Sequence, residues 1–189
     1  MRGGPVARVR LLAALCLLAA CRPARYARYG DPQGAFSCDV PAAWDLRRER
    51  DGIALSGPFD PDFHDGIPEL RIRFHPRGEY ASLSDLVERT LRLHGPERVV
   101  LEPPRPVEVA GRRGVHFVVL CAVPVRPGAV YGVAVEEGGR RLACLRQHAY
   151  AAVEADGGFF VLEYPATRQG YERYAGGFHR LVNSFRLPA

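Results

Sequence analysis

Hydrophobic and polar residues alternate along several short segments of the chain. The clearest case is residues 70–75 (LRIRFH), where three apolar side chains alternate with two arginines and a histidine. A period of two is typical of a strand that has one face in the core and one face in water. The further segments with strand character are residues 36–40, 44–46, 53–55, 107–109, 115–123, 130–135, 142–153 and 159–164.

Two segments have the spacing of amphipathic helices. The first begins after Ser82, a good N-cap residue, and ends at Gly95, which is followed by a proline. The second covers residues 171–185, where large apolar residues recur every three or four positions. Gly176 and Gly177 lie inside this second helix, and we interpret them as a close approach of the helix to the sheet.

Two other stretches lack any periodicity and contain several prolines. Residues 58–67 hold two prolines early on and a glycine, which predicts a loop. Pro103, Pro104 and Pro106 predict an extended connector ahead of the strand-rich second half.

The N-terminus has the pattern of a secretory signal. Three arginines among the first ten residues precede an apolar run over residues 11–20. A run of this length is too short to span a bilayer, which takes about 20 residues, but it fits the h-region of a signal peptide. The run ends in LAAC at residues 18–21, which resembles the lipobox of bacterial lipoproteins. The alternative is an ordinary signal peptide with a coincidental cysteine.

The lipobox resemblance implies an address for the protein. It implies that residues 1–20 are removed and that Cys21 receives a diacylglycerol and an N-acyl chain, which together hold a protein on a membrane. Residues 21–34 would then be the lipidated cysteine and a tether, because they include two prolines and two glycines and no periodicity. The residue that follows the lipidated cysteine is Arg22 and not an aspartate. By the same resemblance, this residue implies sorting to the periplasmic side of the outer membrane.

Residues 35–189 are expected to form one globular domain. The segments FSCDVPAAW near its start and FFVLEYPA and FHRLVNSF near its end resemble the Mog1/PsbP-like group. The resemblance implies an α+β fold in which an antiparallel β-sheet is flanked by helices, an α/β/α sandwich. Plant members of the group assist photosystem II and a fungal member binds a small GTPase. Neither role has a residue motif that can be carried over to this chain.

Composition excludes one class of partner. The chain of 189 residues has a net charge of +5, and all 26 of its basic residues are arginine. Without residues 1–20 the balance is 23 basic against 21 acidic residues. A dedicated nucleic-acid binder carries a basic patch and a strongly basic domain, so no nucleic-acid partner is expected.

Three cysteines remain beyond the lipobox. Cys38, Cys121 and Cys144 would lie outside the cytoplasm, where disulfides persist. Cys121 and Cys144 fall in predicted strands of the same strand-rich block, so we expect them to be the pair if a disulfide forms. The alternative is three buried, reduced cysteines, because the thiol is among the most buried side chains.

The sequence gives no signal for catalysis, a metal or a cofactor. The six histidines have no zinc-binding spacing among themselves or with cysteine, and no nucleophile or nucleotide-binding motif is present. Residues 60–66 resemble a calcium loop, but His64 stands where an oxygen ligand is required, Asp65 where glycine is required and Arg71 where glutamate is required. We therefore expect an acidic surface loop. A cysteine–histidine pair brought together from distant segments would leave no trace in the spacing.

These observations lead to a non-enzymatic expectation. The sequence predicts a lipid-anchored envelope module that meets the membrane through Cys21 and binds an envelope protein or a small ligand. The alternative is a small-ligand or lipid carrier with an apolar pocket between the sheet and a helix. The charged side of the segment 70–75 is a third feature, which fits either a solvated face or a site for an anion or an acidic partner.

Overall fold

The computed structural model describes residues 25–63, 66–124, 134–135 and 143–188. Its main sheet has the strand order β3-β4-β5-β10-β9-β7-β6, with β8 paired to β9, and every pair is antiparallel. The strands are β3 (Asp45–Glu49), β4 (Gly52–Ser56), β5 (Glu69–Pro76), β6 (Val99–Val109), β7 (Arg112–Pro124), β8 (Ala134–Val135), β9 (Ala143–Ala155) and β10 (Gly158–Thr167).

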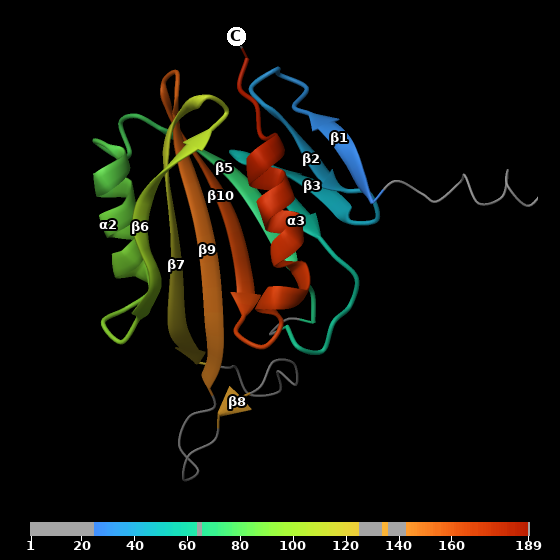
Figure 1. Ribbon diagram of the computed structural model, residues 1–189, viewed down its shortest axis with the longest axis vertical. Helices are drawn as coiled ribbons and strands as arrows, with labels where there is room; N and C mark the ends of the chain where they lie inside the picture. The colour runs from blue at the N-terminus through green and yellow to red at the C-terminus, as the bar shows by residue number, and fades with distance from the viewer. Residues whose placement is uncertain (1–24, 64–65, 125–133, 136–142, 189) are drawn as a thin grey trace, which may run out of the picture.

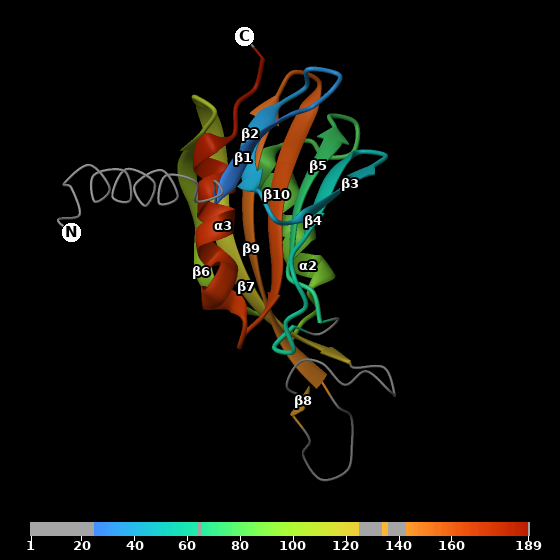
Figure 2. The ribbon, with the colours of Figure 1, turned by 90° about the vertical axis from the view of Figure 1, so that its right-hand side faces the viewer.

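One helix covers each face of this sheet. Helix α2 (Leu83–Leu93) packs on β7 and β9, and α3 (Tyr171–Ser184) packs on the opposite face. Figure 1 shows the two helices on either side of the central strands, and Figure 2 shows the sheet between them. The expected α+β sandwich with an antiparallel sheet flanked by helices is therefore confirmed. Neither described helix combines the length and the apolar character needed to cross a membrane.

Alternation along the central strands sends neighbouring residues to opposite faces. On the α3 side, the core is rich in aromatic rings; Phe160 of β10, Phe178 of α3 and Phe185 just after that helix are all almost fully buried. On the α2 side, a smaller apolar cluster joins Leu86 of the helix to Phe117 of β7. A strand has a side-chain period of two, so each long strand contributes to both clusters.

The structure differs from the predicted tether. Residues 26–30 form β1 (Tyr26–Gly30), which pairs with β2 (Ser37–Pro41) in a separate two-stranded sheet beside α3. Arg28 of β1 bonds the backbone oxygen of Ser184 at the end of α3, at 3.0 Å. The folded part therefore begins before residue 35, because cross-strand pairing orders a segment too short to show a pattern of its own.

Two further expectations need correction. Pro103, Pro104 and Pro106 lie within β6, which is an edge strand, and an edge strand tolerates residues that lack an N–H. Gly176 and Gly177 do not mark a forced close approach to the sheet. A Cβ on Gly176 would meet nothing within 4 Å, and one on Gly177 would make only an ordinary contact with Leu70 at 3.7 Å.

Candidate functional site

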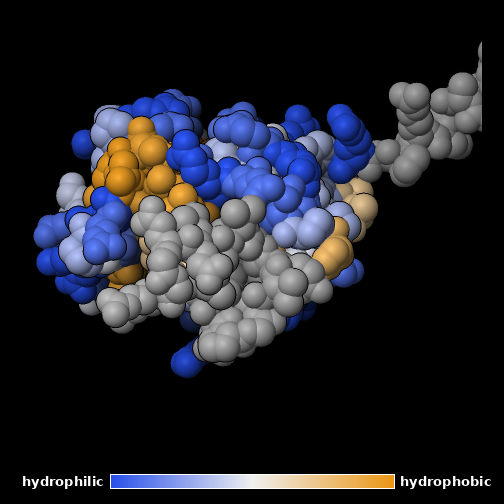
Figure 3. Space-filling model, turned by 90° about the horizontal axis from the view of Figure 1, so that it is seen from below, coloured by the Kyte–Doolittle hydropathy of each residue, from blue (hydrophilic) through white to orange (hydrophobic). Residues whose placement is uncertain are grey.

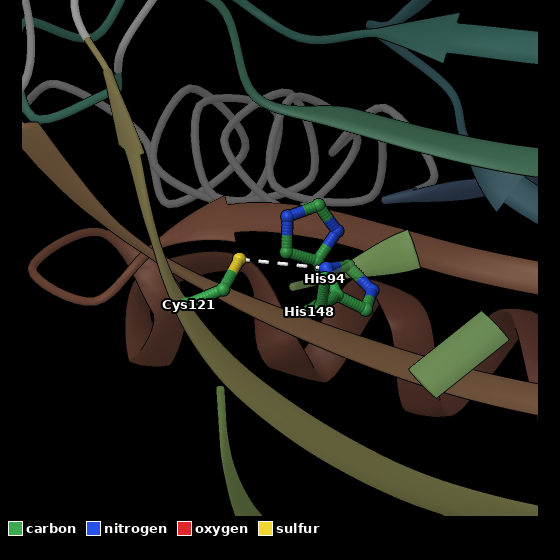
Figure 4. Close-up of side chains that lie close together, drawn as sticks. All are labelled: His94, Cys121 and His148. Carbon is green, nitrogen blue, oxygen red and sulfur yellow. Dashed lines mark hydrogen bonds between the residues drawn. The ribbon is translucent and has the colours of Figure 1, made fainter. Parts of the chain in front are cut away.

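Three potential metal ligands meet beneath the C-terminal end of α2. His94 is the C-cap of α2, Cys121 lies on β7 and His148 lies on β9. Their donor atoms all lie within 4.8 Å of one another. Figure 4 shows the Cys121 sulfur next to the His94 ring, with the His148 ring beside it. Within the described part of the chain, this is the one such grouping.

Local sequence rules explain why these side chains converge. On β7, Cys121 continues the series Phe117 and Val119 that faces α2. On β9, His148 lies directly opposite Val119 and therefore faces the same side. Gly95 has a φ of +81° and ends the helix, which leaves His94 over the two strands.

A buried hydrogen-bond network supports the two histidines. His94 Nε2 lies 2.8 Å from the Tyr150 hydroxyl, which donates to Glu163 Oε1 at 3.2 Å. His148 Nδ1 lies 3.4 Å from the same Glu163 oxygen. Cys121 Sγ lies 3.4 Å from His94 Nδ1. The cluster is therefore a connected set of five side chains and not a chance grouping of three.

The charges in the cluster are fixed by its surroundings. Burial opposes ionisation of Glu163, but the hydrogen bond from His148 and the nearby Arg71 and Arg73 lower the pKa of Glu163 to about 2. Burial and the neighbouring His148 lower the pKa of His94 to about 4. At neutral pH the cluster thus holds a Glu163 carboxylate and a neutral His94 imidazole.

The state of Cys121 limits what the cluster can do. Burial raises the pKa of the Cys121 thiol, whereas a nucleophilic cysteine needs a lowered pKa and a cationic neighbour. The neighbouring His94 has a lowered pKa and is neutral. The pair is therefore a thiol beside an imidazole, a combination suited to binding a soft or borderline metal ion and poorly suited to nucleophilic attack.

The structure tests the cysteine predictions in part. Cys21 and Cys16 lie outside the described residues. The structure does not join Cys121 to Cys144. Cys121 pairs with Arg146 and Cys144 with Val123, so the two cysteines are diagonal neighbours on adjacent strands. Diagonal neighbours lie about 7–8 Å apart, which exceeds the usual disulfide span of 4.4–6.8 Å.

The acidic loop is held by α3 and is not a free surface loop. Asp60 is almost fully buried, and its carboxylate bonds Arg173 and accepts from Tyr174 at 3.1 Å. Asp62 also binds Arg173, at 2.6 Å. Both carboxylates are engaged by cations or hydroxyls of α3, so these described residues are not arranged around a calcium ion; Asp65 lies outside the described residues.

The charged side of β5 faces the same way as the cluster. Arg71 lies directly opposite Glu163 in the sheet. Each charged residue on this side already has a partner: Arg71 pairs with Glu69, Arg73 with Glu49 and His75 with Glu79. An anion would have to displace these carboxylates, so the structure favours a partly covered, internally paired face.

Exposed apolar side chains lie at the C-terminal end of α2 and at the start of β6. Figure 3 shows hydrophobic side chains gathered on the side of α2 and β6. Leu93, at the end of α2, is 82% exposed, and Val99, Val100 and Leu101 at the start of β6 are also exposed. A groove of about 540 Å³ runs between α2 and β6–β7, lined by Leu83, Val87, Leu91 and Val115 among others. This groove is partly open to solvent.

Neither a protein-family model nor a curated protein matches the sequence. Solved structures do match. The solution structure of CyanoP, the cyanobacterial PsbP of Synechocystis sp. PCC 6803, aligns with a TM-score of 0.56 at 11% identity, over 89% of this chain and 96% of that protein. The Ran-binding protein Mog1p of Saccharomyces cerevisiae aligns with a TM-score of 0.52 at 13% identity, over 86% of this chain and 95% of Mog1p.

The chain has a Mog1/PsbP-like fold. A protein from Bacteroides thetaiotaomicron also aligns, with a TM-score of 0.51 at 11% identity, over 87% of this chain. This chain spans 49% of that longer protein. At such identities a Mog1/PsbP-like likeness establishes the architecture, while function has to be argued from the sites.

Sequence reasoning missed the cluster because its members come from three elements. His94 and Cys121 are 27 residues apart, and His94 and Tyr150 are 56 apart. One signal was present. Glu163 interrupts the otherwise apolar run FFVLEYPA, and a carboxylate within a buried strand needs partners. That glutamate indicated a polar site on one face of β10.

Proposed function

We propose that this protein is a lipid-anchored binding or accessory module of the bacterial cell envelope, without enzymatic activity. The observation that carries the proposal is the LAAC segment at residues 18–21, which ends the apolar run of a signal peptide. Acyl chains on Cys21 would hold the domain on a leaflet, on the periplasmic side of the outer membrane. The domain would then meet an envelope protein close to that membrane.

The exposed apolar end of the domain is the surface through which we propose it acts. Leu93 at the end of α2 and Val99, Val100 and Leu101 at the start of β6 are exposed, and the open groove lies between α2 and β6–β7. Exposed apolar patches with a polar rim mark sites of protein interaction. Elsewhere on the described surface, charged side chains form ion pairs such as Arg180 with Asp39, and the other exposed large apolar residues include Phe59 and Ile67. This end is therefore the region best suited to a partner.

A non-enzymatic role fits the chemistry of the buried cluster. Cys121 and His94 are a thiol and a neutral imidazole, which is the wrong charge state for a nucleophilic pair. The alternative function is a small-ligand or lipid carrier. An enclosed pocket that buries most of its ligand would favour a carrier, and the open groove beside α2 favours a protein partner instead.

Intact mass spectrometry of the protein recovered from its host's membranes tests the anchor. We expect a mass that lacks residues 1–20 and includes acyl chains, and we expect Cys21→Ser to abolish the acylation. Cys16→Ser is the matched control, because Cys16 lies in the same apolar run and is removed with it. An uncleaved or unacylated wild-type protein would overturn the anchor and bring the carrier forward.

A soluble Cys21→Ser protein tests the carrier alternative directly. Native mass spectrometry and solvent extraction of that protein should yield no stoichiometric lipid or metabolite. A retained ligand would favour the carrier over the module.

A further inference from the structure

We propose that His94, Cys121 and His148 form a binding site for one zinc-type transition-metal ion. Zinc bonds to nitrogen at about 2.0–2.1 Å and to sulfur at about 2.3 Å, so ligating N and S atoms of a tetrahedral site lie roughly 3.5 Å apart. Cys121 Sγ and His94 Nδ1 are 3.4 Å apart, and all three donor atoms lie within 4.8 Å of one another. The required ligand spacing is nearly present.

The hydrogen bonds direct a free lone pair of His94 into this space. The Tyr150 hydroxyl has one proton and gives it to Glu163, since a carboxylate can only accept. The hydroxyl must then accept from His94 Nε2, 2.8 Å away. His94 therefore carries its proton on Nε2, and the lone pair on Nδ1 faces the Cys121 sulfur.

The same carboxylate sets the tautomer of His148. His148 Nδ1 lies 3.4 Å from Glu163 Oε1 and 3.3 Å from the Tyr150 hydroxyl, and a proton on Nδ1 that these oxygens accept leaves Nε2 as the ligating atom. A carboxylate behind a ligating histidine is the usual outer-shell arrangement of zinc sites, where it fixes the ring and raises its basicity. Glu163 thus serves as a positioning residue for His148 directly and for His94 through Tyr150.

The binding step balances in charge and protons. The metal ion takes the place of the Cys121 thiol proton, which leaves to solvent as the sulfur–metal bond forms. The two imidazoles bind through lone pairs and release nothing. The thiolate and the Glu163 carboxylate then partly offset the two positive charges of the ion, which lowers the cost of burying a dication, while Arg71, Arg73, Arg98 and Arg146 add positive charge near the cluster.

The donor set and its frame select the kind of ion. Imidazole and thiolate suit zinc and its neighbours, whereas magnesium and calcium prefer oxygen ligands. Cys121 and His148 are 4% and 8% exposed and stand on adjacent paired strands, so two ligands are held rigidly. His94 is half-buried at the end of α2. Three protein ligands leave a fourth position for water or a partner's side chain.

The test uses the full-length chain in detergent, stripped of metal with a chelator. We expect one Zn²⁺ per chain, and we expect Co²⁺ to give the absorption of a tetrahedral site with a thiolate charge-transfer band. Cys121→Ser should abolish that band, and His148→Gln should weaken binding at least 100-fold. Glu163→Gln should weaken it about 10–100-fold, as expected for an outer-shell residue.

Cys38→Ser is the matched control. Cys38 is equally buried but lies in the core on the α3 side, so its loss should leave the Co²⁺ spectrum unchanged. A circular-dichroism spectrum of each variant separates loss of binding from loss of fold.

A second measurement needs no variant. Bound Zn²⁺ should protect Cys121 of the wild-type chain from iodoacetamide, as read by peptide mass spectrometry. Absence of stoichiometric uptake would overturn the proposal, as would a Co²⁺ spectrum that survives Cys121→Ser. Fast alkylation of Cys121 at the same rate with and without Zn²⁺ would also overturn the proposal and would indicate a reactive thiol. None of these outcomes depends on acylation of Cys21, so the metal site and the anchor can fail separately.

Discussion

The two faces of the main sheet are built from the same strands yet bury different kinds of side chain. Leu162 and Ala149 belong to the apolar core on the α3 side. Their neighbours in sequence, Glu163 and His148, lie on the α2 side in a polar network. Consecutive residues of one strand therefore contribute to the two different sides of the sheet.

The difference separates a face that packs an apolar core from a face that also buries a polar network. Helix α3 packs aromatic rings against the sheet, as in the stacked pair of Phe178 of α3 and Tyr164 of β10, at 6.1 Å between ring centres. Helix α2 is shorter, and its end covers a carboxylate, two histidines and a thiol. A buried polar network stabilises less than a well-packed apolar core and fails when incomplete. Its presence on one face indicates a role beyond folding.

The largest expected effect comes from emptying the α3 side. Phe178→Ala removes a ring that is 1% exposed and should lower the free energy of unfolding by about 3–5 kcal/mol. The neighbouring residue His179 is exposed and provides the control. His179→Ala should change the free energy of unfolding by less than about 0.5 kcal/mol. Urea unfolding followed by circular dichroism measures both. Similar losses in the two variants would mean that α3 does not bury the face seen here.

The next effect concerns the α2 side. Glu163→Ala in the metal-free protein leaves the His148 N–H and the Tyr150 hydroxyl without their acceptor. A buried donor without a partner costs about 1–3 kcal/mol, and Glu163→Gln, which keeps an acceptor, should cost less. Thermal unfolding of the two variants measures the difference. Equal stability of Glu163→Ala and wild type would show that the network contributes nothing to folding.

A smaller effect on stability is expected from Asp60, the buried carboxylate that contacts α3. Burial opposes ionisation of Asp60, but hydrogen bonds from Arg173, the Asp62 N–H and Tyr174 lower its pKa. A carboxyl with a lowered pKa stabilises the fold above its unfolded pKa of about 3.9, and that stability is lost as the pH falls through the folded value. Asp60→Asn should cost about 1 kcal/mol at pH 7, since Arg173 is half-exposed and screened.

The same variant should match wild type in strong acid. The two curves of stability against pH should therefore converge below about pH 4. Parallel curves from pH 7 to pH 2 would contradict the assignment to Asp60.

The smallest expected effect is a gain. Gly176 lies on the exposed side of α3 with open space around its Cβ position. Gly176→Ala should stabilise the protein by about 0.5–1 kcal/mol, because alanine loses less backbone entropy in a helix. The melting temperature measures this gain. A loss would restore the expectation of a close approach between this glycine and the sheet.

Sequence patterns predicted the frame well and the site poorly. Alternation located most strands, and Ser82 and Gly95 marked both ends of α2, because these signals are local. The strand β1 was missed because its order comes from pairing with β2. The His94–Cys121–His148 cluster depends on strand order and register, which bring distant positions together and leave no trace in local spacing.

The early start of β1 limits how far the folded domain could stand from a lipid anchor on Cys21. Only residues 22–25 separate Cys21 from the first strand, and four extended residues span at most about 14 Å. A domain acylated at Cys21 would therefore stay close to the surface of the leaflet that holds its acyl chains. It could not reach across the periplasm. Its search for a partner would be lateral diffusion in two dimensions, limited to molecules embedded in that leaflet or held close above it.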